Sequence, residues 1–281
     1  MTTGKVTPRL IAVIGRQRSG TTVLRQFIGS AERSFDLGEV FHANTARKLS
    51  FWGFVHDMAA ADPKFRFPLR WPDAWDAFID RTSTERAADV LVFDVKVEYF
   101  PIILRTDGDA TGFLFDHASV SYIWLRRRNT AAQVISRHVA AKSGIWSETD
   151  PDARPGLLER RYAIWGGQAD TNRCAGDILI DPEDIMREIN VVERQDETID
   201  RMLGDKFDLR LTYEELFDTS GNFDTKVVES VAALTGLEAG DFERRPVLRR
   251  QRRRSVLDGI GNARDIVTRF AGTGHEWMLN A

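Results

Sequence analysis

Cysteine is almost absent from this chain of 281 residues, since Cys174 is the only one. A single thiol excludes an intramolecular disulfide and a zinc site built mainly of cysteine. The five histidines form no His-Glu-x-x-His pattern, the metal-binding motif of one large class of zinc enzymes. A chain that cannot form its own disulfide suits a reducing compartment, so we expect a cytoplasmic location.

Long hydrophobic runs are also missing. A membrane-spanning helix needs roughly 20 consecutive apolar residues, whereas the longest run near the N-terminus, Leu10–Ile14, has the length of a strand. The opening Met1–Lys5 lacks the apolar core of a secretion signal. We therefore expect no integral membrane segment.

Lysine is scarce, because 7 of the 39 basic residues are Lys and the other 32 are Arg. The planar fork of Arg suits phosphate and sulfate oxygens, although a GC-rich genome gives the same excess. The 42 acidic residues bring the formal net charge to −3. This near balance argues against a general nucleic-acid binder, so we expect no nucleic-acid partner.

Apolar, β-branched segments alternate with helical patterns along the chain. This alternation predicts an α/β protein in which helices flank both faces of a parallel sheet. The length suits one domain over residues 1–281, with a lid or acceptor-side insertion around residues 45–85. The expected strands are Leu10–Ile14, Val90–Val95, Ser121–Leu125, Asp177–Ile180 and Asp208–Leu211. The expected helices are Thr21–Ser30, Thr45–Ala60, Asp73–Thr82, Thr130–Ser143, Gly156–Cys174, Pro182–Leu203 and Thr225–Thr235.

The first expected strand runs into a turn that contains two glycines and two arginines, Gly15-Arg16-Gln17-Arg18-Ser19-Gly20. A strand, a turn and a helix start together form an anion site, because unpaired N–H groups converge there and the helix dipole attracts negative charge. The spacing is that of nucleotide triphosphatases, but Thr21 stands where their motif needs Lys. The alternative is an ordinary strand–turn–helix with incidental basic residues.

The run Arg18-Ser19-Gly20-Thr21-Thr22 resembles the 5′-phosphosulfate loop of sulfotransferases that use 3′-phosphoadenosine 5′-phosphosulfate (PAPS). The likeness is to bacterial and carbohydrate-directed members, which often have Arg where others have Lys. It implies a P-loop-like fold, PAPS as cofactor, 3′-phosphoadenosine 5′-phosphate (PAP) as product, and no required metal. The cofactor-binding residues that it implies in the loop are Arg16, Gln17, Arg18, Ser19, Gly20, Thr21 and Thr22.

A second motif follows the expected strand Ser121–Leu125. The strand ends in three arginines and Asn129, and Ser136 lies eight residues after Arg128, about two helical turns. A bidentate Arg and a hydroxyl can hold one phosphate from two directions. The 3′-phosphate site of the same family has this pattern, so the resemblance assigns Arg128 and Ser136 to that phosphate. Alone, the pattern also fits a solvated Arg cluster beside a helix Ser.

Two weaker matches extend the resemblance. Tyr213 follows a strand, as does a family Tyr that lies near the adenine, although a Tyr there also suits a core. The basic run Arg244–Arg254 occupies the place of the third cofactor segment, where Arg250 and Gln251 match only approximately. A solvated basic face and a nucleic-acid contact are the alternatives for this run.

Sulfuryl transfer needs an anion cradle, a cation near the departing oxygen and a base for the acceptor proton. Arg18 is the expected cation. The resemblance points to Glu39 as the base, because carbohydrate-directed and bacterial members have Glu there. Glu98 is the second candidate, since it matches the catalytic His of aryl and steroid members. Lys96 is expected as a second cation, and His42, Lys96 and Glu98 are assigned to acceptor binding.

The acceptor is expected to be a hydroxyl, in preference to an amine, of a carbohydrate, a glycolipid headgroup or a small metabolite. Aromatic residues that could contact it are Phe51, Trp52, Phe65, Phe67, Trp71 and Trp75. A homodimer stays open. The rival functions are a P-loop kinase or triphosphatase, in which Asp94 would hold Mg²⁺, and a catalytically silent nucleotide-binding protein.

Overall fold

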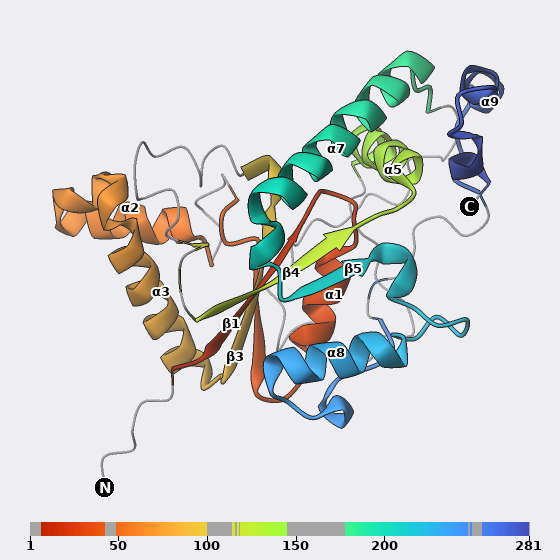
Figure 1. The fold of residues 1–281 in the computed structure, drawn as a ribbon. Helices are drawn as coiled ribbons and strands as arrows, with labels where there is room; N and C mark the ends of the chain where they lie inside the picture. Colours follow the sequence, from red (N-terminus) through yellow and green to blue (C-terminus); the bar gives the residue numbers. More distant parts are fainter. Residues whose placement is uncertain are drawn as a thin grey trace, which may run out of the picture.

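The computed structural model describes residues 7–42, 49–99, 114, 115, 117, 119–144, 178–246, 248 and 255–280. Five strands form one sheet in the order β2-β3-β1-β4-β5 (Figure 1). All four strand pairs are parallel, as predicted. The strands are β1 (Arg9–Gly15), β2 (Ser34–Gly38), β3 (Val90–Lys96), β4 (Val120–Arg126) and β5 (Leu209–Thr212).

The described α-helices are α1 (Thr21–Ile28), α2 (Phe51–Ala61), α3 (Trp71–Arg86), α5 (Thr130–Ser143), α7 (Pro182–Leu203), α8 (Thr225–Thr235) and α9 (Ala263–Phe270). Short 3₁₀ helices connect them: η1 (Pro63–Arg66), η2 (Pro68–Arg70), η3 (Val97–Tyr99), η5 (Gly204–Lys206), η6 (Tyr213–Glu215), η7 (Ala239–Asp241) and η8 (Glu276–Leu279).

Helices cover both faces of the sheet, because successive side chains of a strand point to opposite sides. From β1, Ile11 and Val13 pack with α1 and α8 on one face. Leu10 and Ile14 pack on the other face with α2, α3 and the C-terminal end of α7. The predicted α/β fold, a parallel sheet flanked on both faces by helices, is confirmed.

Helices α5, α7 and α8 begin and end where the sequence predicts. Each begins after a side-chain cap, since Asn129, Asp181 and Asp224 accept a hydrogen bond from the first turn. Two of them end before a glycine in the left-handed conformation, Gly144 after α5 and Gly236 after α8. Local capping chemistry therefore fixes these boundaries.

Other predicted elements differ from the structure. The strand Asp177–Ile180 is wrong within the described residues, because Ile178 makes only an isolated bridge with Ile260. Strand β2 was not predicted as a strand, and α9 was not predicted at all. Helix α2 begins at Phe51, where Ser50 caps it. The helix Gly156–Cys174 lies outside the described residues.

The chain between residues 51 and 86 forms α2, η1, η2 and α3. Phe51, Trp75 and Phe78 from this part are fully buried and pack in the same cluster as Phe93 of β3. Part of the expected aromatic acceptor cluster, Phe51 and Trp75, therefore belongs to the core. Phe67, by contrast, is exposed. A lid or acceptor-side role for this segment stays a prediction.

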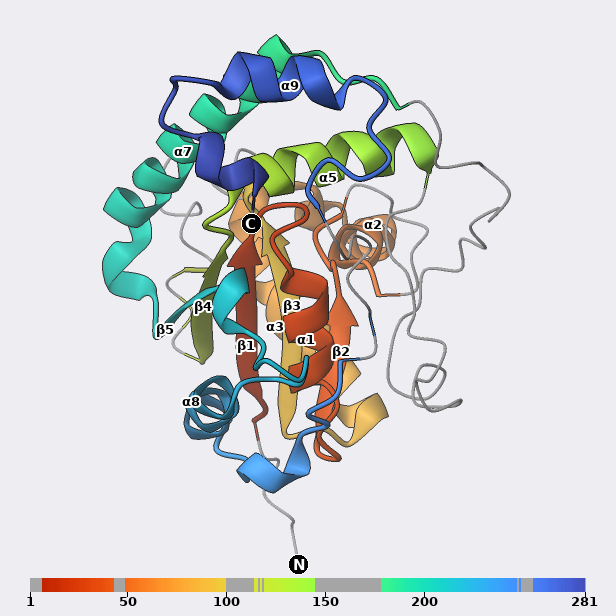
Figure 2. The same cartoon turned by 90° about the vertical axis from the view of Figure 1, so that its right-hand side faces the viewer.

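The carboxyl ends of the strands meet at one end of the sheet. In Figure 2 the arrowheads point towards α5 and α9, which lie across the top of the view, while α8 lies at the opposite end. Residues of α5, α7 and α9 share a third apolar cluster there. In the described part of the chain, no helix combines the length and the apolar character needed to cross a membrane.

Candidate active site

The phosphate loop, residues 16–20, joins the end of β1 to the start of α1. Two of its residues have positive φ angles, 65° at Arg18 and 95° at Gly20. Ser19 closes the turn, because its N–H (3.2 Å) and its hydroxyl (2.8 Å) both donate to the carbonyl oxygen of Arg16. Helix α1 then begins with neither a side-chain cap nor an acidic residue in its first turn. This arrangement suits an external anion at the helix N-terminus.

Both glycines of the loop motif are required by close packing. A Cβ on Gly15 would lie 2.6 Å from the methyl carbon of Thr21 and 2.8 Å from the carbonyl oxygen of Leu125. A Cβ on Gly20 would lie 2.5 Å from the ring of Tyr213. Tyr213 therefore packs directly against the loop, which its predicted place near the nucleotide requires.

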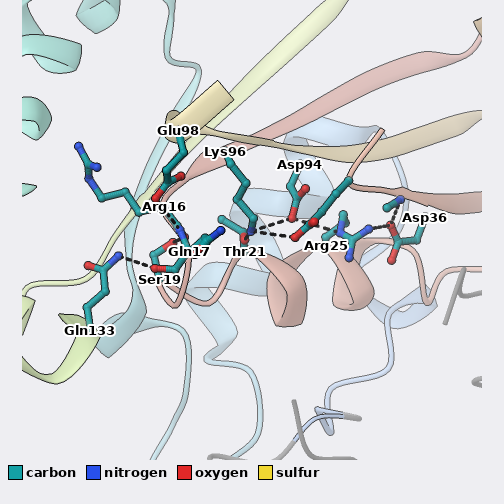
Figure 3. A network of polar contacts seen from close by, with 12 residues as sticks. Arg16, Gln17, Ser19, Thr21, Arg25, Asp36, Asp94, Lys96, Glu98 and Gln133 are labelled. Atoms are coloured by element: carbon teal, nitrogen blue, oxygen red, sulfur yellow. Dashed lines mark hydrogen bonds and ion pairs between the residues drawn. The ribbon is translucent and has the colours of Figure 1, made fainter. Parts of the chain in front are cut away.

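Three neighbouring elements anchor the loop, and Figure 3 shows two of these contacts, those of Gln133 and Glu98. Arg16, 6% exposed, donates from Nε to Oδ1 of Asp196 on α7 at 2.7 Å. Gln133 on α5 donates from Nε2 to the carbonyl oxygen of Gln17 at 2.8 Å. The N–H of Gln17 donates to Oε1 of Glu98, beyond β3, at 3.3 Å. The loop is thus fixed by α7, α5 and the end of β3.

Burial dominates the electrostatics of Asp196. It raises the pKa of this carboxyl above its usual range, and the attraction of Arg16 only partly opposes that effect. The contact of Arg16 with Asp196 anchors the loop to α7, and contact of Arg16 with a cofactor stays a prediction.

Arg18 joins the two sequence motifs in space. Its Nε donates to the hydroxyl oxygen of Ser136 on α5 at 3.0 Å. Arg127 also contacts the loop, since its Nη1 donates to the carbonyl oxygen of Arg18 at 3.4 Å. The Arg127 guanidinium also stacks over the ring of Tyr213, 4.8 Å from its centre.

Arg128 and Ser136, which the sequence assigns to one phosphate, have different partners in this structure. The Arg128 side chain is 60% exposed and its Nε lies 3.8 Å from Oε2 of Glu214. The carboxylate of Glu214 accepts from the N–H groups of Arg128 at 3.0 Å and Asn129 at 3.1 Å. Glu214 thus fixes the turn between β4 and α5 and lies close to the guanidinium of Arg128.

Lys96 and Glu39 come together beside the first residue of α1. Lys96, 3% exposed, donates from Nζ to the hydroxyl of Thr21. The same ammonium lies 3.0 Å from Oδ2 of Asp94 and 3.7 Å from Oε1 of Glu39. The Glu39 side chain is 22% exposed. A partly exposed carboxylate and a buried cation therefore lie next to the N-terminal end of α1.

A buried charge network continues from Lys96 away from the loop (Figure 3). Arg25, on α1, lies between two carboxylates: Nη1 is 2.8 Å from Oδ1 of Asp36, and Nε is 3.8 Å from Oδ2 of Asp94. Burial raises the pKa of Asp36 to about 6, although Arg25 lowers it. Burial also disfavours the charge on Asp94, but Lys96 and Arg25 outweigh it and hold the pKa of Asp94 below its usual range.

The remaining predicted site residues lie around the loop and the first turn of α1, or outside the described residues. Glu98 is exposed and contacts the loop amide of Gln17. His42 is partly buried, and its backbone N–H donates to the carbonyl oxygen of Glu39 at 3.1 Å. Thr22 is in the first turn of α1. Arg250 and Gln251 lie outside the described residues.

Sequence reasoning missed Arg25, Asp36, Asp196 and Glu214. A signal for the first two existed, because Asp36 and Asp94 interrupt apolar strand patterns and Arg25 interrupts the apolar face of α1. Charges of both signs inside buried elements require each other as partners. Asp196 and Glu214 gave no such signal, since they lie in acidic, solvent-exposed sequence patterns.

No protein-family model matches the chain, and no curated protein does either. Among solved structures, the chain is similar to the sulfotransferase domain from the Synechococcus PCC 7002 olefin synthase. The two share 18% sequence identity, and the match covers 85% of this chain and 77% of that domain, with a TM-score of 0.39.

Proposed function

We propose that this protein is a PAPS-dependent sulfotransferase that transfers a sulfuryl group to a hydroxyl. The observation that carries the proposal is the hydrogen bond between Arg18 and Ser136. These residues belong to two motifs 110 positions apart, and each motif on its own resembles a different part of one family's cofactor site. Their convergence at 3.0 Å supports a common ligand for both.

The residues around the loop fit an anionic cofactor. Helix α1 has no acidic residue or side-chain cap at its start. Arg18 and Lys96 add positive charge on two sides of this helix end. Arg128 is exposed at the start of α5, where a 3′-phosphate could reach it. When bound, PAPS would supply a sulfuryl group whose S–O bond to the 5′-phosphate breaks as a bond to the acceptor oxygen forms, leaving PAP.

Three side chains would share the catalytic work. Arg18 and the first N–H groups of α1 would hold the phosphosulfate oxygens. Arg18 would also offset the negative charge that develops on the departing oxygen, and Lys96, positioned on Thr21, would be a second cation there. Glu39 would accept the proton of the acceptor hydroxyl, because it is the partly exposed carboxylate next to Lys96.

Glu98 ranks second as a base. Its carboxylate already accepts the N–H of Gln17, so in this conformation it serves the loop. A role in acceptor binding, together with His42, remains part of the proposal.

The kinase or triphosphatase alternative is weaker because of the partners of Asp94. In that reading Asp94 would hold Mg²⁺, but here it lies 3.0 Å from the Lys96 ammonium and 3.8 Å from Arg25. Two cations beside a fully buried carboxylate oppose a third. Sugars, glycolipid headgroups and small metabolites all stay candidate acceptors, and a cytoplasmic location and a homodimer stay proposals.

Calorimetry with PAP, 5′-AMP and ATP, each with and without Mg²⁺, tests this function. We expect PAP to bind about 30- to 150-fold more tightly than 5′-AMP, the value of one bidentate charge-assisted contact of roughly 2–3 kcal/mol. Equal affinity for PAP and 5′-AMP, or a strict Mg²⁺ requirement, would contradict the proposal. Transfer of labelled sulfate from PAPS to a panel of sugars, glycolipids and phenols then identifies the acceptor and separates an enzyme from a silent binder.

A further inference from the structure

We propose that Arg25 is a positioning residue that sets the places of both Glu39 and Lys96 relative to the phosphate loop. The inference rests on the proposed function, since it concerns the candidate base and the candidate cation of that reaction. Arg25 is 5% exposed and lies one helical turn after Thr21 on α1. Among the described residues, its side chain hydrogen-bonds to Asp36 and forms ion pairs with Asp36 and Asp94.

The first connection runs from Arg25 to Glu39. Arg25 Nη1 donates to Oδ1 of Asp36 at 2.8 Å, and the same oxygen accepts the N–H of Gly38 at 2.9 Å. Gly38 has a φ of 81°, and the pairing of β2 with β3 shifts register between Asp36 and Gly38. Asp36 therefore holds the bend that ends β2, and Glu39 is the next residue after that bend.

The second connection runs from Arg25 to Lys96. Arg25 Nε faces Oδ2 of Asp94 at 3.8 Å, and Lys96 Nζ lies 3.0 Å from the same oxygen. Asp94 and Lys96 are two positions apart on β3, so their side chains leave the strand on the same face. The same Lys96 ammonium donates to the hydroxyl of Thr21, so Asp94, Lys96 and Thr21 lie together at this point. Arg25 thus ties α1, β2 and β3 together at the point where Glu39 and Lys96 meet.

Stability alone does not account for this network. Buried ion pairs are often replaceable by apolar side chains without loss of stability, because removing charges from water costs about as much as their attraction returns. The carboxyl of Asp36 illustrates the cost, since its pKa stays raised even with Arg25 beside it. Charged partners instead fix the positions of the groups that they join. Here the groups whose positions depend on the network are Glu39 and Lys96.

Three variants test the inference. Arg25→Gln removes the bridge but leaves two buried carboxylates with one fewer cation, which endangers folding. The double variant Arg25→Gln/Asp36→Asn removes one charge of each sign. The amide oxygen that replaces Oδ1 of Asp36 can still accept the N–H of Gly38. Arg25→Lys restores a cation that is too short to span both carboxylates. Val231→Ala, in the fully buried face of α8, is the control for lost stability without a change in the network.

Two measurements are made on each variant. The first is turnover of PAPS to PAP, with water alone and with any acceptor found in the panel, beside PAP affinity by calorimetry. The second is amide hydrogen exchange of the segment 36–41, which needs no acceptor. We expect the double variant to lose about 10²-fold in kcat, the usual cost of a misplaced catalytic group, with PAP affinity within about threefold of wild type. Exchange in the segment should rise about tenfold or more.

The other outcomes are decisive as well. Arg25→Lys should recover part of kcat, and Val231→Ala should keep the wild-type kcat and wild-type exchange in the segment 36–41. Wild-type exchange in a folded double variant would overturn the inference, whatever the turnover. An equal loss of kcat and PAP affinity would also overturn it, because Arg25 would then support the loop as a whole. Failure of the wild-type protein to prefer PAP over 5′-AMP contradicts the proposed function instead, so the two failures are distinguishable.

Discussion

Lys96, at the end of β3, donates a hydrogen bond to the hydroxyl of Thr21, the first residue of α1. Thr21 stands where the loop of a nucleotide triphosphatase has its lysine. A neighbouring strand therefore brings an ammonium group to the place where the loop itself has none. Asp94, 3.0 Å from Lys96 Nζ, keeps that ammonium at the helix end.

Arg18 should matter more for turnover than for nucleotide binding. Arg18→Ala is expected to lower kcat strongly and PAP affinity less, because the charge that Arg18 offsets develops in the transition state. Arg18→Lys should keep part of the rate. Steady-state kinetics beside calorimetry separates the two effects.

The φ of 65° at Arg18 provides a control for this experiment. Glycine accepts that conformation without strain, so Arg18→Gly should be more stable than Arg18→Ala by about 1 kcal/mol. Both variants should be equally inactive. Turnover that follows the melting temperature instead would assign Arg18 a structural role.

Glu39 should behave as a general base. Glu39→Gln keeps the shape of the side chain but cannot take a proton, so turnover should fall by about 10²- to 10⁴-fold. PAP affinity should stay within a few-fold of wild type, because Glu39 lies beside Lys96 and not on the loop. Glu98→Gln should lower turnover by a smaller factor than Glu39→Gln does. The reverse order of the two variants, measured on the true acceptor, would make Glu98 the base.

Arg128 should account for the preference for a 3′-phosphate. Arg128→Ala is expected to weaken PAP binding by about 30- to 150-fold and to leave 5′-AMP binding nearly unchanged. Arg126→Ala is the matched control from the same run, since its guanidinium pairs with Asp200 on α7 at 2.9 Å. A PAP preference that survives in Arg128→Ala would remove Arg128 from the cofactor site.

Asp36 should make the stability depend on pH. Burial raises its pKa from 3.8 to about 6 in the folded protein. Between about pH 4 and pH 6 the folded state therefore keeps a proton that the unfolded chain releases, and the free energy of unfolding falls as pH rises through this window. Two pH units correspond to about 3 kcal/mol at most.

Urea unfolding between pH 4.5 and pH 7 measures this dependence. The free energy of unfolding of the wild type, relative to that of Asp36→Asn, should fall by about 2 kcal/mol as pH rises from 4.5 to 7. The exposed Asp57→Asn on α2 is the control and should show no such trend. A difference between wild type and Asp36→Asn that stays constant with pH would contradict the raised pKa.

Elements with local signals were predictable from the sequence, and elements that depend on distant partners were not. Asn129, Asp181 and Asp224 mark helix starts by their own side chains, so three helices were predicted without error. Strand β2 carries Asp36 in its middle, and the cation that pairs with this buried charge, Arg25, lies eleven residues earlier in the chain. Apolar residues near Ile178 suggested a strand, but among the described residues Ile178 makes only an isolated bridge with Ile260.

The same distinction applies to the candidate site. The phosphate loop is a contiguous motif, so its residues could be named from the family resemblance of that one segment. The pairing of Arg18 with Ser136 and of Glu214 with the start of α5 depends on how α5 and η6 approach the loop. The number of residues between two segments does not tell how closely they pack in the folded chain.

The phosphate loop is held in place from outside by Asp196, Gln133 and Glu98. A loop that is ordered during folding loses little conformational entropy when a ligand arrives, so its contacts with that ligand count almost fully towards affinity. Asp196 sits on a helix that follows the loop by more than 160 residues in the chain. Substitutions on α7, outside the proposed nucleotide site, could therefore change the affinity of this loop for its ligand.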